Sequence, residues 1–398
     1  MSDSKSYADA TRLTTLGRTP SAYHGLVNLP VHRGSTVLFP TLAEFEKSNL
    51  RPDETGRVTY GLNGTPTTFA VETAVAELEG AHGACVVPSG LAAITAALLA
   101  VLKAGDHLLI TDSAYGPGRR FSDHILARFG VEVEYYDPLV GADIAKLFKP
   151  NTRAILTESP GSYTFEIQDI PAIATAAHAH NVLVLLDNTW ATPLYFKPFA
   201  HGVDISIQAA TKYMSGHSDL LAGTITFTKE CEPLVRQAVR DLGISLAPDD
   251  CYLLLRGLRS MDVRLKHQEK NALDLANWLA ERPEVKQVLH PARPDCPGHD
   301  LWKRDFTGAS GLFSIILHPL EKPALAAFLD HLSLFGMGFS WGGFESLIVP
   351  GNPRPIRTAT AWTEPGQLLR VSVGLEHLDD LKADLDAGFA RMNAVLGR

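Results

Sequence analysis

Short apolar runs alternate with helical stretches along the first half of the chain, and this alternation constrains the fold more than any other feature. Runs at 107–111, 131–135, 154–158, 182–187 and 205–208 predict strands. Stretches at 119–130 and 171–180 predict helices between them. Strands that alternate with helices in this way form mostly parallel sheets covered on both faces. The run LVLLD at 183–187 is continuously apolar, as expected of a strand buried on both sides.

Two helix starts are marked by capping residues. Thr65 followed by Pro66 predicts an N-cap and a first helical residue, and Gly80 is expected to end that helix. Ser89 and Gly90 are expected to begin a second helix, for which Gly105 predicts the end. The second helix follows a short strand directly, so the turn between them lies at a strand end.

The length of 398 residues predicts two or three domains. Residues 1–60 are turn-rich and are expected to form an extended arm, 61–256 a large domain, and 257–398 a smaller α/β domain. The smaller domain is predicted from two helical stretches and two strand-like runs, at 260–282, 377–395, 312–317 and 368–373.

Composition excludes several classes of protein. The net charge is −8 and no basic tract occurs, which argues against nucleic acid or an anionic membrane as a partner. The longest apolar run, 91–102, is too short to span a bilayer, and the N-terminus has no signal-peptide core. None of the four cysteines forms a CxxC pair, so neither a disulfide framework nor a metal site is expected. We therefore expect a reduced, cytoplasmic protein.

Two motifs place chemically useful side chains at strand ends. In ATKYMSGHSD (210–219), Lys212 follows a small strand-terminating segment and precedes a Gly/Ser-rich loop. A lysine held there is a nucleophile if burial lowers its pKa, and otherwise an ordinary surface lysine. Asp187 ends the apolar run at 183–187, where ligands bind in open α/β sheets. Its partner is either a protonated ring nitrogen or the backbone of the next turn.

Three further signals are weaker when taken singly. Ser89 and Gly90 at a helix start could bind a phosphate, or form an ordinary strand–helix turn. Tyr115 could stack on a flat ring or belong to the core. Arg370, in an apolar strand, could bind a substrate carboxylate or a structural acidic partner. Their order along the chain matches what pyridoxal 5'-phosphate (PLP) requires: phosphate, ring face, ring nitrogen, aldehyde and substrate carboxylate.

Five motifs carry a resemblance to a known family. They are YGLNGTPT (60–67), DNTWATP (187–193), QAATKYMSGHSD (208–219), FSWGGFESL (339–347) and RVSVGLE (370–376). Together they resemble the trans-sulfuration (Cys/Met metabolism) family of fold-type I PLP-dependent enzymes, over nearly the whole chain. The resemblance implies a large domain with a mostly parallel mixed sheet, a smaller C-terminal α/β domain, and a homotetramer made of two dimers.

The resemblance also implies roles for individual residues. Lys212 would carry the cofactor and move protons, Asp187 would pair with the pyridine nitrogen, and Tyr115 would stack on the ring. Tyr60 would reach into the neighbouring subunit's site, which makes Lys212, Tyr115 and Tyr60 the expected catalytic residues. The phosphate would be held by Gly90, Leu91 and Thr211, and the substrate by Arg370, Ser340 and Trp341.

Two features favour the β-lyase branch of the family. Trp341 stands where γ-lyases and γ-synthases of the family usually have leucine, and Ser162 stands where they usually have asparagine. An indole beside the substrate would narrow the site around the β-carbon, although it could equally serve core packing. The expected reaction is β-elimination of L-cystathionine to homocysteine, pyruvate and ammonia. The alternatives are a broader cysteine or cystine C–S lyase, a γ-eliminating or γ-replacing relative, and a catalytically silent, partner-binding descendant.

Three departures from the family pattern stand out. Leu62 replaces an arginine that binds phosphate across the dimer, and Ala209 replaces a serine three residues before the lysine. The segment VRDLG (239–243) lacks a tyrosine that β-lyases of the family can offer at the site's mouth. The first two changes remove phosphate contacts, and Arg57 or the pair Arg119–Arg120 are candidates to supply the missing charge.

Overall fold

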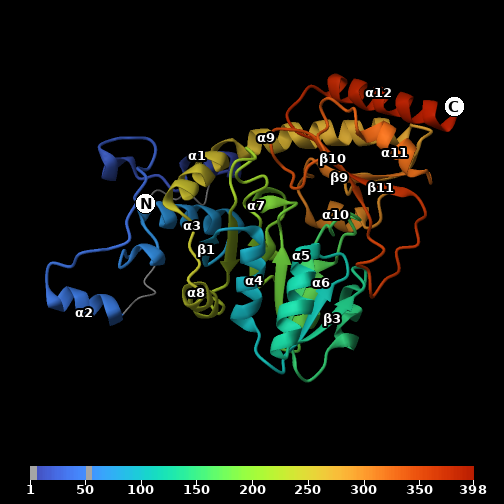
Figure 1. Ribbon diagram of the computed structural model, residues 1–398. Helices are drawn as coiled ribbons and strands as arrows, with labels where there is room; N and C mark the ends of the chain where they lie inside the picture. Colours follow the sequence, from blue (N-terminus) through green and yellow to red (C-terminus); the bar gives the residue numbers. More distant parts are fainter. Residues whose placement is uncertain (1–6, 51–55) are drawn as a thin grey trace.

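The computed structural model describes residues 7–50 and 56–398, which form a larger unit and a smaller one, each around its own sheet (Figure 1). The first six residues, in the segment where no signal peptide is expected, lie outside the described residues, as do 51–55 of the predicted arm. Within the described part of the chain, no helix is both long enough and apolar enough to cross a bilayer.

The larger sheet is a mixed seven-stranded sheet in the order β1-β7-β6-β5-β4-β2-β3. Strands β2 to β6 are mutually parallel, whereas β7 runs antiparallel to both β6 and β1. The carboxyl ends of the parallel strands therefore share one edge, and Asp187 ends β5 at that edge. The strands are β1 (Gly83–Val87), β2 (His107–Thr111), β3 (Glu132–Tyr136), β4 (Thr152–Glu158), β5 (Leu183–Asp187), β6 (Ile205–Gln208) and β7 (Gly223–Phe227).

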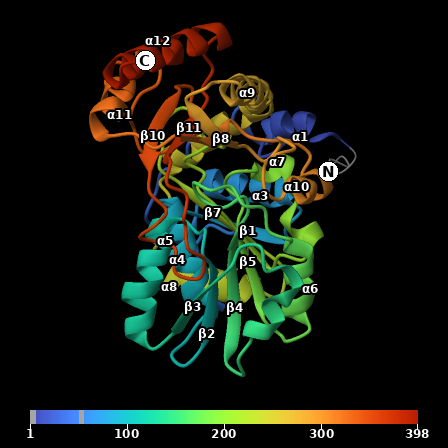
Figure 2. The same ribbon diagram turned by 90° about the vertical axis from the view of Figure 1, so that its right-hand side faces the viewer.

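Helices cover both faces of this sheet, which accounts for its continuously apolar strands. In β5, Val184 and Leu186 join the core beneath α3 and α6, while Leu185 joins the core beneath α4 and α8. Figure 2 shows α6 on one side of the sheet and α4 and α5 on the other. These helices are α3 (Pro66–Glu79), α4 (Gly90–Val101), α5 (Gly116–Phe121), α6 (Ile170–His178), α7 (Thr192–Tyr195) and α8 (Glu232–Asp241).

The smaller unit is an antiparallel sheet covered by helices on one face. Its strands lie in the order β10-β11-β9-β8, and their inward side chains pack on α11, α12 and the second half of α9. The long helix α9 (Pro248–Ala280) runs from the larger unit into the smaller one (Figure 1). The remaining elements are β8 (Val285–Leu289), α10 (His299–Asp305), β9 (Leu312–Leu317), α11 (Lys322–Leu329), β10 (Leu347–Gly351), β11 (Gln367–Ser372) and α12 (Leu378–Leu396).

The N-terminal segment contains α1 (Asp9–Thr15) and α2 (Leu42–Leu50), and Figure 1 shows α2 standing away from the body of the molecule. Helix α1 packs on the larger unit, where Leu13 and Leu16 join the core, and Leu29 of the same segment joins that core as well. Several large apolar side chains of this segment are exposed to solvent: Leu26, Val27, Leu38, Leu42 and Phe45.

Most of the predicted elements are confirmed, and the bounds of several are corrected. The strands at 107–111, 205–208 and 312–317 have the predicted bounds, and Thr65 caps α3, which ends at Gly80. Helix α4 ends at Val101, before the predicted Gly105, because Leu102 is extended and Gly105 lies in the following turn. Helix α9 begins at Pro248, well before 260, so the predicted domain boundary after 256 falls inside a continuous helix.

The predicted helix at 119–130 is irregular. It begins earlier, as α5 from Gly116, and continues as a π-helical turn (Ser122–Leu126) and a 3-10 turn (Ala127–Phe129). Gly130, at φ 85°, ends it in the left-handed conformation that glycine adopts most easily. Other short helical turns are Pro20–Tyr23, Gly61–Asn63, Gly141–Leu147 and Pro198–His201.

Candidate active site

Lys212 lies between the two units of the fold. Its Nζ donates to the Ser340 hydroxyl oxygen at 2.5 Å, and it lies 5.2 Å from the centre of the Trp341 ring. Lys212 follows β6 on the larger unit, whereas Ser340 and Trp341 belong to the loop before β10 on the smaller one. The structure therefore joins two motifs that are 128 residues apart in the sequence.

The electrostatic surroundings make Lys212 more available than a free lysine as the neutral amine, the form that acts as nucleophile and base. Burial and the nearby charge of Arg370 lower the pKa of Lys212 from 10.5 to about 8, against a smaller opposing effect of Asp187. Both causes disfavour the ammonium form. A larger fraction of the side chain is therefore the neutral amine near neutral pH.

Asp187 is held at the end of β5 by the residue two positions later. Its Oδ1 accepts from the Thr189 backbone N–H at 3.0 Å and from the Thr189 hydroxyl at 2.5 Å. The Thr189 hydroxyl oxygen also accepts from the Ala209 N–H at 2.8 Å, which ties Asp187 to the segment before Lys212. Burial raises the pKa of Asp187 above its usual value, so the carboxylate lacks a full cationic partner.

A second carboxyl group lies beside Asp187. Glu158 ends β4 and is paired in register with Asp187, and its Oε2 accepts from the Tyr115 N–H at 2.6 Å. Burial and the charge of Asp187 raise the pKa of Glu158 well above its usual value. The sequence analysis did not select Glu158 or Thr189 for this site. Glu158 pairs with Asp187 across the sheet, and Thr189 lies two residues after Asp187 in the chain.

Arg370 is partly buried, and its hydrogen-bonding groups are only partly satisfied. Its Nη2 donates to the Ser340 carbonyl oxygen at 2.8 Å, and its guanidinium carbon lies 5.5 Å from the centre of the Tyr163 ring. Its Nε is buried with no hydrogen-bond partner in the described structure. Burial lowers the pKa of Arg370. A buried donor left unpaired is costly, so the site is built for an anionic ligand at this place.

The loop that carries Ser340 and Trp341 is held in an unusual conformation. Ser340 has φ 77°, in the left-handed region, and Gly342 has φ 82°. A Cβ at Gly342 would approach the Tyr213 nitrogen to 3.1 Å, and the Tyr213 and Trp341 ring centres are 5.4 Å apart. The residue after Lys212 thus fixes the indole beside the lysine.

The predicted phosphate residues gather at the start of α4. Ser89 caps this helix through a hydrogen bond from the Ala92 N–H at 3.0 Å, so the amides of Gly90 and Leu91 lie in its first turn. A Cβ at Gly90 would meet the Cβ of Ala209 at 2.5 Å, so this helix start lies against the segment that leads to Lys212. First-turn amides have no partner within a helix and attract anions.

The other predicted phosphate contact, Thr211, is engaged within the protein. Its hydroxyl donates to the Ala222 carbonyl at 3.1 Å and accepts from the Ala222 N–H at 3.0 Å. Gly223 follows, and a Cβ there would lie 2.3 Å from the Ser89 carbonyl oxygen. Thr211 is therefore near the start of α4, but its hydroxyl already has two protein partners.

The two predicted tyrosines differ in position. Tyr115 lies at the sheet edge next to Glu158 and is 45% exposed; burial and the charge of Asp187 raise its pKa. Tyr60 is 49% exposed and is the last residue of the arm. The next residue, Gly61, donates its N–H to the Ser35 carbonyl oxygen of the arm. Among the described contacts, none joins Tyr60 to Lys212 of the same chain.

The arginines that could replace the missing arginine at Leu62 lie in different surroundings. Leu62 is 39% exposed and lines a small cavity of about 80 Å³ together with Arg57. Arg119 is buried and its guanidinium is bonded to Asp112, so it is wrong as a phosphate ligand. Arg120 is exposed and lies near Tyr115. The charge of Arg120 lowers the pKa of the Tyr115 hydroxyl, but burial has the larger effect and raises it.

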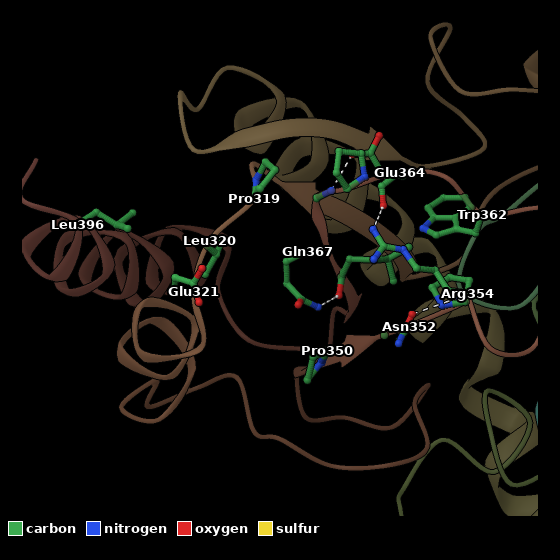
Figure 3. Close-up of a pocket in the computed structure, with 15 residues that line it drawn as sticks. Pro319, Leu320, Glu321, Pro350, Asn352, Arg354, Trp362, Glu364, Gln367 and Leu396 are labelled. Carbon is green, nitrogen blue, oxygen red and sulfur yellow. Dashed lines mark hydrogen bonds between the residues drawn. The ribbon is translucent and has the colours of Figure 1, made fainter.

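A larger cavity of about 560 Å³ lies elsewhere, in the smaller unit (Figure 3). Two of its charged residues are engaged: Arg354 donates to the Glu364 carbonyl oxygen, and the Glu364 carboxylate accepts from Lys286. None of the candidate residues lines it. The chemistry of the protein is therefore assigned to the Lys212 site.

Comparison with known proteins decides the family. The model of the Cys/Met metabolism PLP-dependent enzymes matches residues 10–390. The chain belongs to this family. The family's fold, an α/β large unit with a second smaller unit, is the one described above.

Two relatives show how closely the chain follows the family. The cystathionine beta-lyase MetC of Escherichia coli is 44% identical over 388 residues, which cover 96% of this chain and 98% of that protein. An L-alanine/L-glutamate racemase of Wolbachia pipientis is 41% identical, covering 97% and 98%. Among solved structures, metB of Corynebacterium glutamicum has a TM-score of 0.88 at 28% identity, covering 98% of this chain and 100% of that one.

The cofactor of this family is PLP, and the residues present fit it. PLP requires an anion site for its phosphate, an amine for its aldehyde and a carboxylate for its ring nitrogen. The start of α4, the Lys212 amine with its lowered pKa and the poorly compensated Asp187 supply these. The unpaired Arg370 Nε leaves a place for the carboxylate of an amino-acid substrate.

Proposed function

We propose that this enzyme is a carbon–sulfur β-lyase that cleaves L-cystathionine to homocysteine, pyruvate and ammonia, as a step of methionine biosynthesis. The observation that carries the proposal is the Trp341 ring 5.2 Å from the Lys212 amine, beside Arg370. The similarity to the cystathionine beta-lyase of Escherichia coli, over nearly both chains, supports it.

Several residues would hold the cofactor. Lys212 would bind its aldehyde carbon, Asp187 would accept from its protonated ring nitrogen, and the Tyr115 ring would lie on its face. The amides of Gly90 and Leu91 would bind the phosphate, aided by the helix dipole. Bound PLP supplies an electron sink for the charge that develops when the substrate's α-proton is removed.

The remaining steps belong to the chain's own side chains. Arg370 would orient the substrate by binding its carboxylate, with Ser340 alongside. Lys212, once free, would take the α-proton, since its lowered pKa leaves a larger fraction of it unprotonated near neutral pH than of an ordinary lysine. The β-carbon–sulfur bond then breaks, the thiol leaves with the electron pair of that bond, and the remaining enamine hydrolyses to pyruvate and ammonia.

The assembly and location follow the same reasoning. We propose a homotetramer made of two dimers, in which residues 1–60 form an arm and Tyr60 completes the neighbour's site, with 61–256 and 257–398 as the two domains. The exposed apolar side chains of the arm support this, and so does the absence of a described contact between Tyr60 and Lys212 of one chain. The four cysteines are free and buried, which supports a cytoplasmic location.

One assay separates the proposed reaction from its neighbours. Purified enzyme is incubated with L-cystathionine, and pyruvate and 2-oxobutyrate are measured. Pyruvate should dominate; predominant 2-oxobutyrate would instead identify a γ-lyase. Parallel reactions with L-cystine and L-cysteine test the broader lyase, and polarimetry with L-alanine tests racemisation, the activity that the Wolbachia relative is named for.

A further inference from the structure

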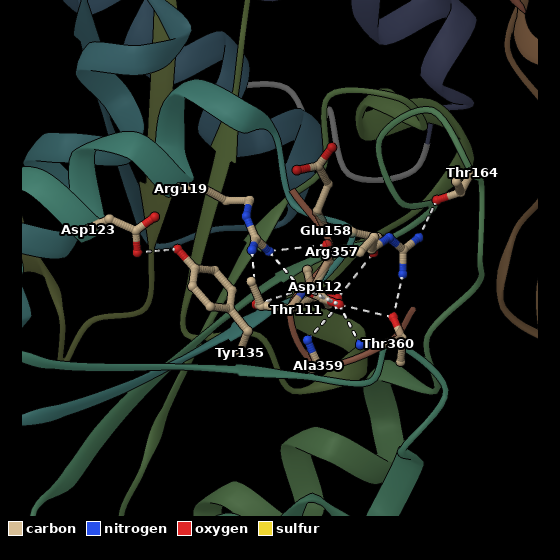
Figure 4. Close-up of polar contacts among 12 residues, drawn as sticks. Thr111, Asp112, Arg119, Asp123, Tyr135, Glu158, Thr164, Arg357, Ala359 and Thr360 are labelled. Carbon is tan, nitrogen blue, oxygen red and sulfur yellow. Dashed lines mark hydrogen bonds and ion pairs between the residues drawn. The ribbon is translucent and has the colours of Figure 1, made fainter. Parts of the chain in front are cut away.

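A network of buried polar groups joins the two units beside the proposed active site (Figure 4). Asp112, directly after β2, is fully buried. Its carboxylate accepts from the backbone N–H groups of Thr358, Ala359 and Thr360, at 2.7 to 3.1 Å, and from both threonine hydroxyls. These three residues belong to the smaller unit, in the loop between β10 and β11.

The carboxylate is also paired with a cation from its own unit. Arg119 donates to Asp112 Oδ1 at 3.0 Å and to the Thr358 hydroxyl at 3.2 Å, and its guanidinium stacks 3.5 Å over the centre of the Tyr135 ring. Burial would raise the pKa of Asp112, but the hydrogen bonds from Thr358, Thr360 and Arg119 outweigh it and lower the pKa. The carboxylate is therefore ionised, as a strong acceptor for the loop must be.

A second contact fastens the same loop to another segment of the larger unit. Arg357 pairs with the Glu166 carboxylate and donates to the Thr164 hydroxyl at 2.6 Å. Its side chain is only 4% exposed. Breaking a buried pair by removing one partner is strongly disruptive, because the other charge stays buried and unpaired.

This second contact leads directly to Arg370. Tyr163, next to Thr164, has its ring centre 5.5 Å from the Arg370 guanidinium. The ring also packs on β10, where a Cβ at Gly351 would approach it to 2.6 Å. The segment that Arg357 holds therefore forms one wall of the place where the substrate carboxylate would bind.

We propose that Arg357 and Asp112 are positioning residues for the substrate-carboxylate half of the active site. We call residues 357–360, with their partners Asp112 and Glu166, the interdomain clasp. The clasp fixes the smaller unit, which carries Arg370, against the larger unit, which carries Lys212, before substrate arrives. The proposal rests on the proposed function, because it assigns Arg370 to the carboxylate.

The size of the effect follows from the geometry that the carboxylate requires. A guanidinium recognises a carboxylate through directed hydrogen bonds, and a misplacement of about 1 Å can cost about a hundredfold in rate or binding. The cofactor contacts of Lys212, Asp187 and α4 lie within the larger unit and do not pass through the clasp. Loosening the clasp should therefore weaken recognition of the carboxylate and leave cofactor binding intact.

Two ligands of one carbon skeleton test this. L-Norleucine has no β-leaving group, so it binds without elimination, and pentylamine is the same molecule without its carboxylate. Binding of each to PLP-loaded enzyme is measured by titration. Arg357→Ala should weaken norleucine about tenfold or more and change pentylamine less than about twofold. The absorbance of the lysine-bound cofactor should stay as in the wild type.

Three further variants sharpen the comparison. Thr360→Ala, which removes a clasp hydroxyl and no charge, should act in the same direction with a smaller loss. Arg354→Ala is the matched control, since Arg354 lies on the same loop and bonds only within it. In an Arg370→Met background, Arg357→Ala should cause no further loss of norleucine binding, because its effect is transmitted through Arg370.

Each outcome decides the matter. Equal weakening of norleucine and pentylamine, or no weakening in Arg357→Ala, would overturn the clasp as a positioning device. So would an undiminished loss in the Arg370→Met background. If Arg357→Ala does not fold, the same comparison with Thr360→Ala decides. A wild-type protein that takes up no cofactor would refute the proposed function itself, and this inference with it.

Discussion

The pKa of Lys212 can be tested before any substrate is added. The apoenzyme must present a neutral amine to capture PLP, since an ammonium group cannot attack an aldehyde. Burial and Arg370 lower the pKa of this amine from 10.5 to about 8. Covalent capture of the cofactor should therefore rise with pH and reach half of its maximal rate near pH 8.

The structure gives the magnitude of this effect. At about pH 7.5, an amine with a pKa near 8 is roughly a quarter neutral, whereas an unperturbed lysine is neutral to about one part in a thousand. The shift corresponds to roughly 3 kcal/mol between the two protonation states. Capture near neutral pH should thus be about two hundred times faster than for an ordinary lysine of equal access.

Removing Arg370 tests the cause of the shift. Arg370→Met takes away a positive charge that disfavours the ammonium form, so the pKa of Lys212 rises and the midpoint of capture moves to higher pH. Burial is the larger cause, so only part of the shift is reversed. Apoenzyme is mixed with PLP across a pH series, reduced with borohydride at timed points, and the modified fraction is measured by mass spectrometry.

The assay has two control variants, and its measured midpoints can refute the reasoning. Lys212→Ala should capture nothing, and Arg354→Met, which removes an exposed arginine of the smaller unit, should leave the midpoint unchanged. A wild-type midpoint near 10.5, or a midpoint that Arg370→Met leaves unmoved or shifts downward, would refute the electrostatic reasoning.

Three other outcomes are expected. Mixing inactive Tyr60→Ala with inactive Lys212→Ala should restore activity, up to about a quarter of the sites for random dimers, and no recovery despite proven subunit exchange would count against a shared site. Leu62→Arg should tighten cofactor binding, measured by titration of apoenzyme, by about tenfold if no other cation already serves the phosphate. Trp341→Leu should raise the share of 2-oxobutyrate formed from L-cystathionine, measured by chromatography, because the indole no longer fills the space beside Lys212.

The parts of the fold that could be predicted are those set by local sequence. The run 183–187 forms β5 because a strand covered by helices on both faces must be apolar throughout. Thr65 and Ser89 mark helix starts because their hydroxyls accept from N–H groups that the helix leaves unpaired. Asp187 falls at the ligand-binding edge because the carboxyl ends of parallel strands share that edge.

The parts that escaped prediction depend on distant contacts. Asp112 and Thr358 are 246 residues apart, and nothing local in either segment indicates that they meet. Glu158 comes to lie beside Asp187 only once β4 and β5 are paired in register. The start of α9 at Pro248, twelve residues before the predicted 260, also escaped prediction, because the first half of this helix packs in the core of the larger unit and the second half in that of the smaller one.

The charges of the site also explain why it should select an anionic ligand. Lys212 and Arg370 are both partly buried, and burial lowers the pKa of each, so the protein pays to keep two cationic side chains near one another. Asp187 opposes them, but its own pKa is raised by burial and its carboxylate is satisfied mainly by Thr189. A phosphate at α4 and a carboxylate at Arg370 would relieve this imbalance, whereas an amine without a carboxylate would not. The unliganded site therefore favours binding of an amino acid over binding of the corresponding amine.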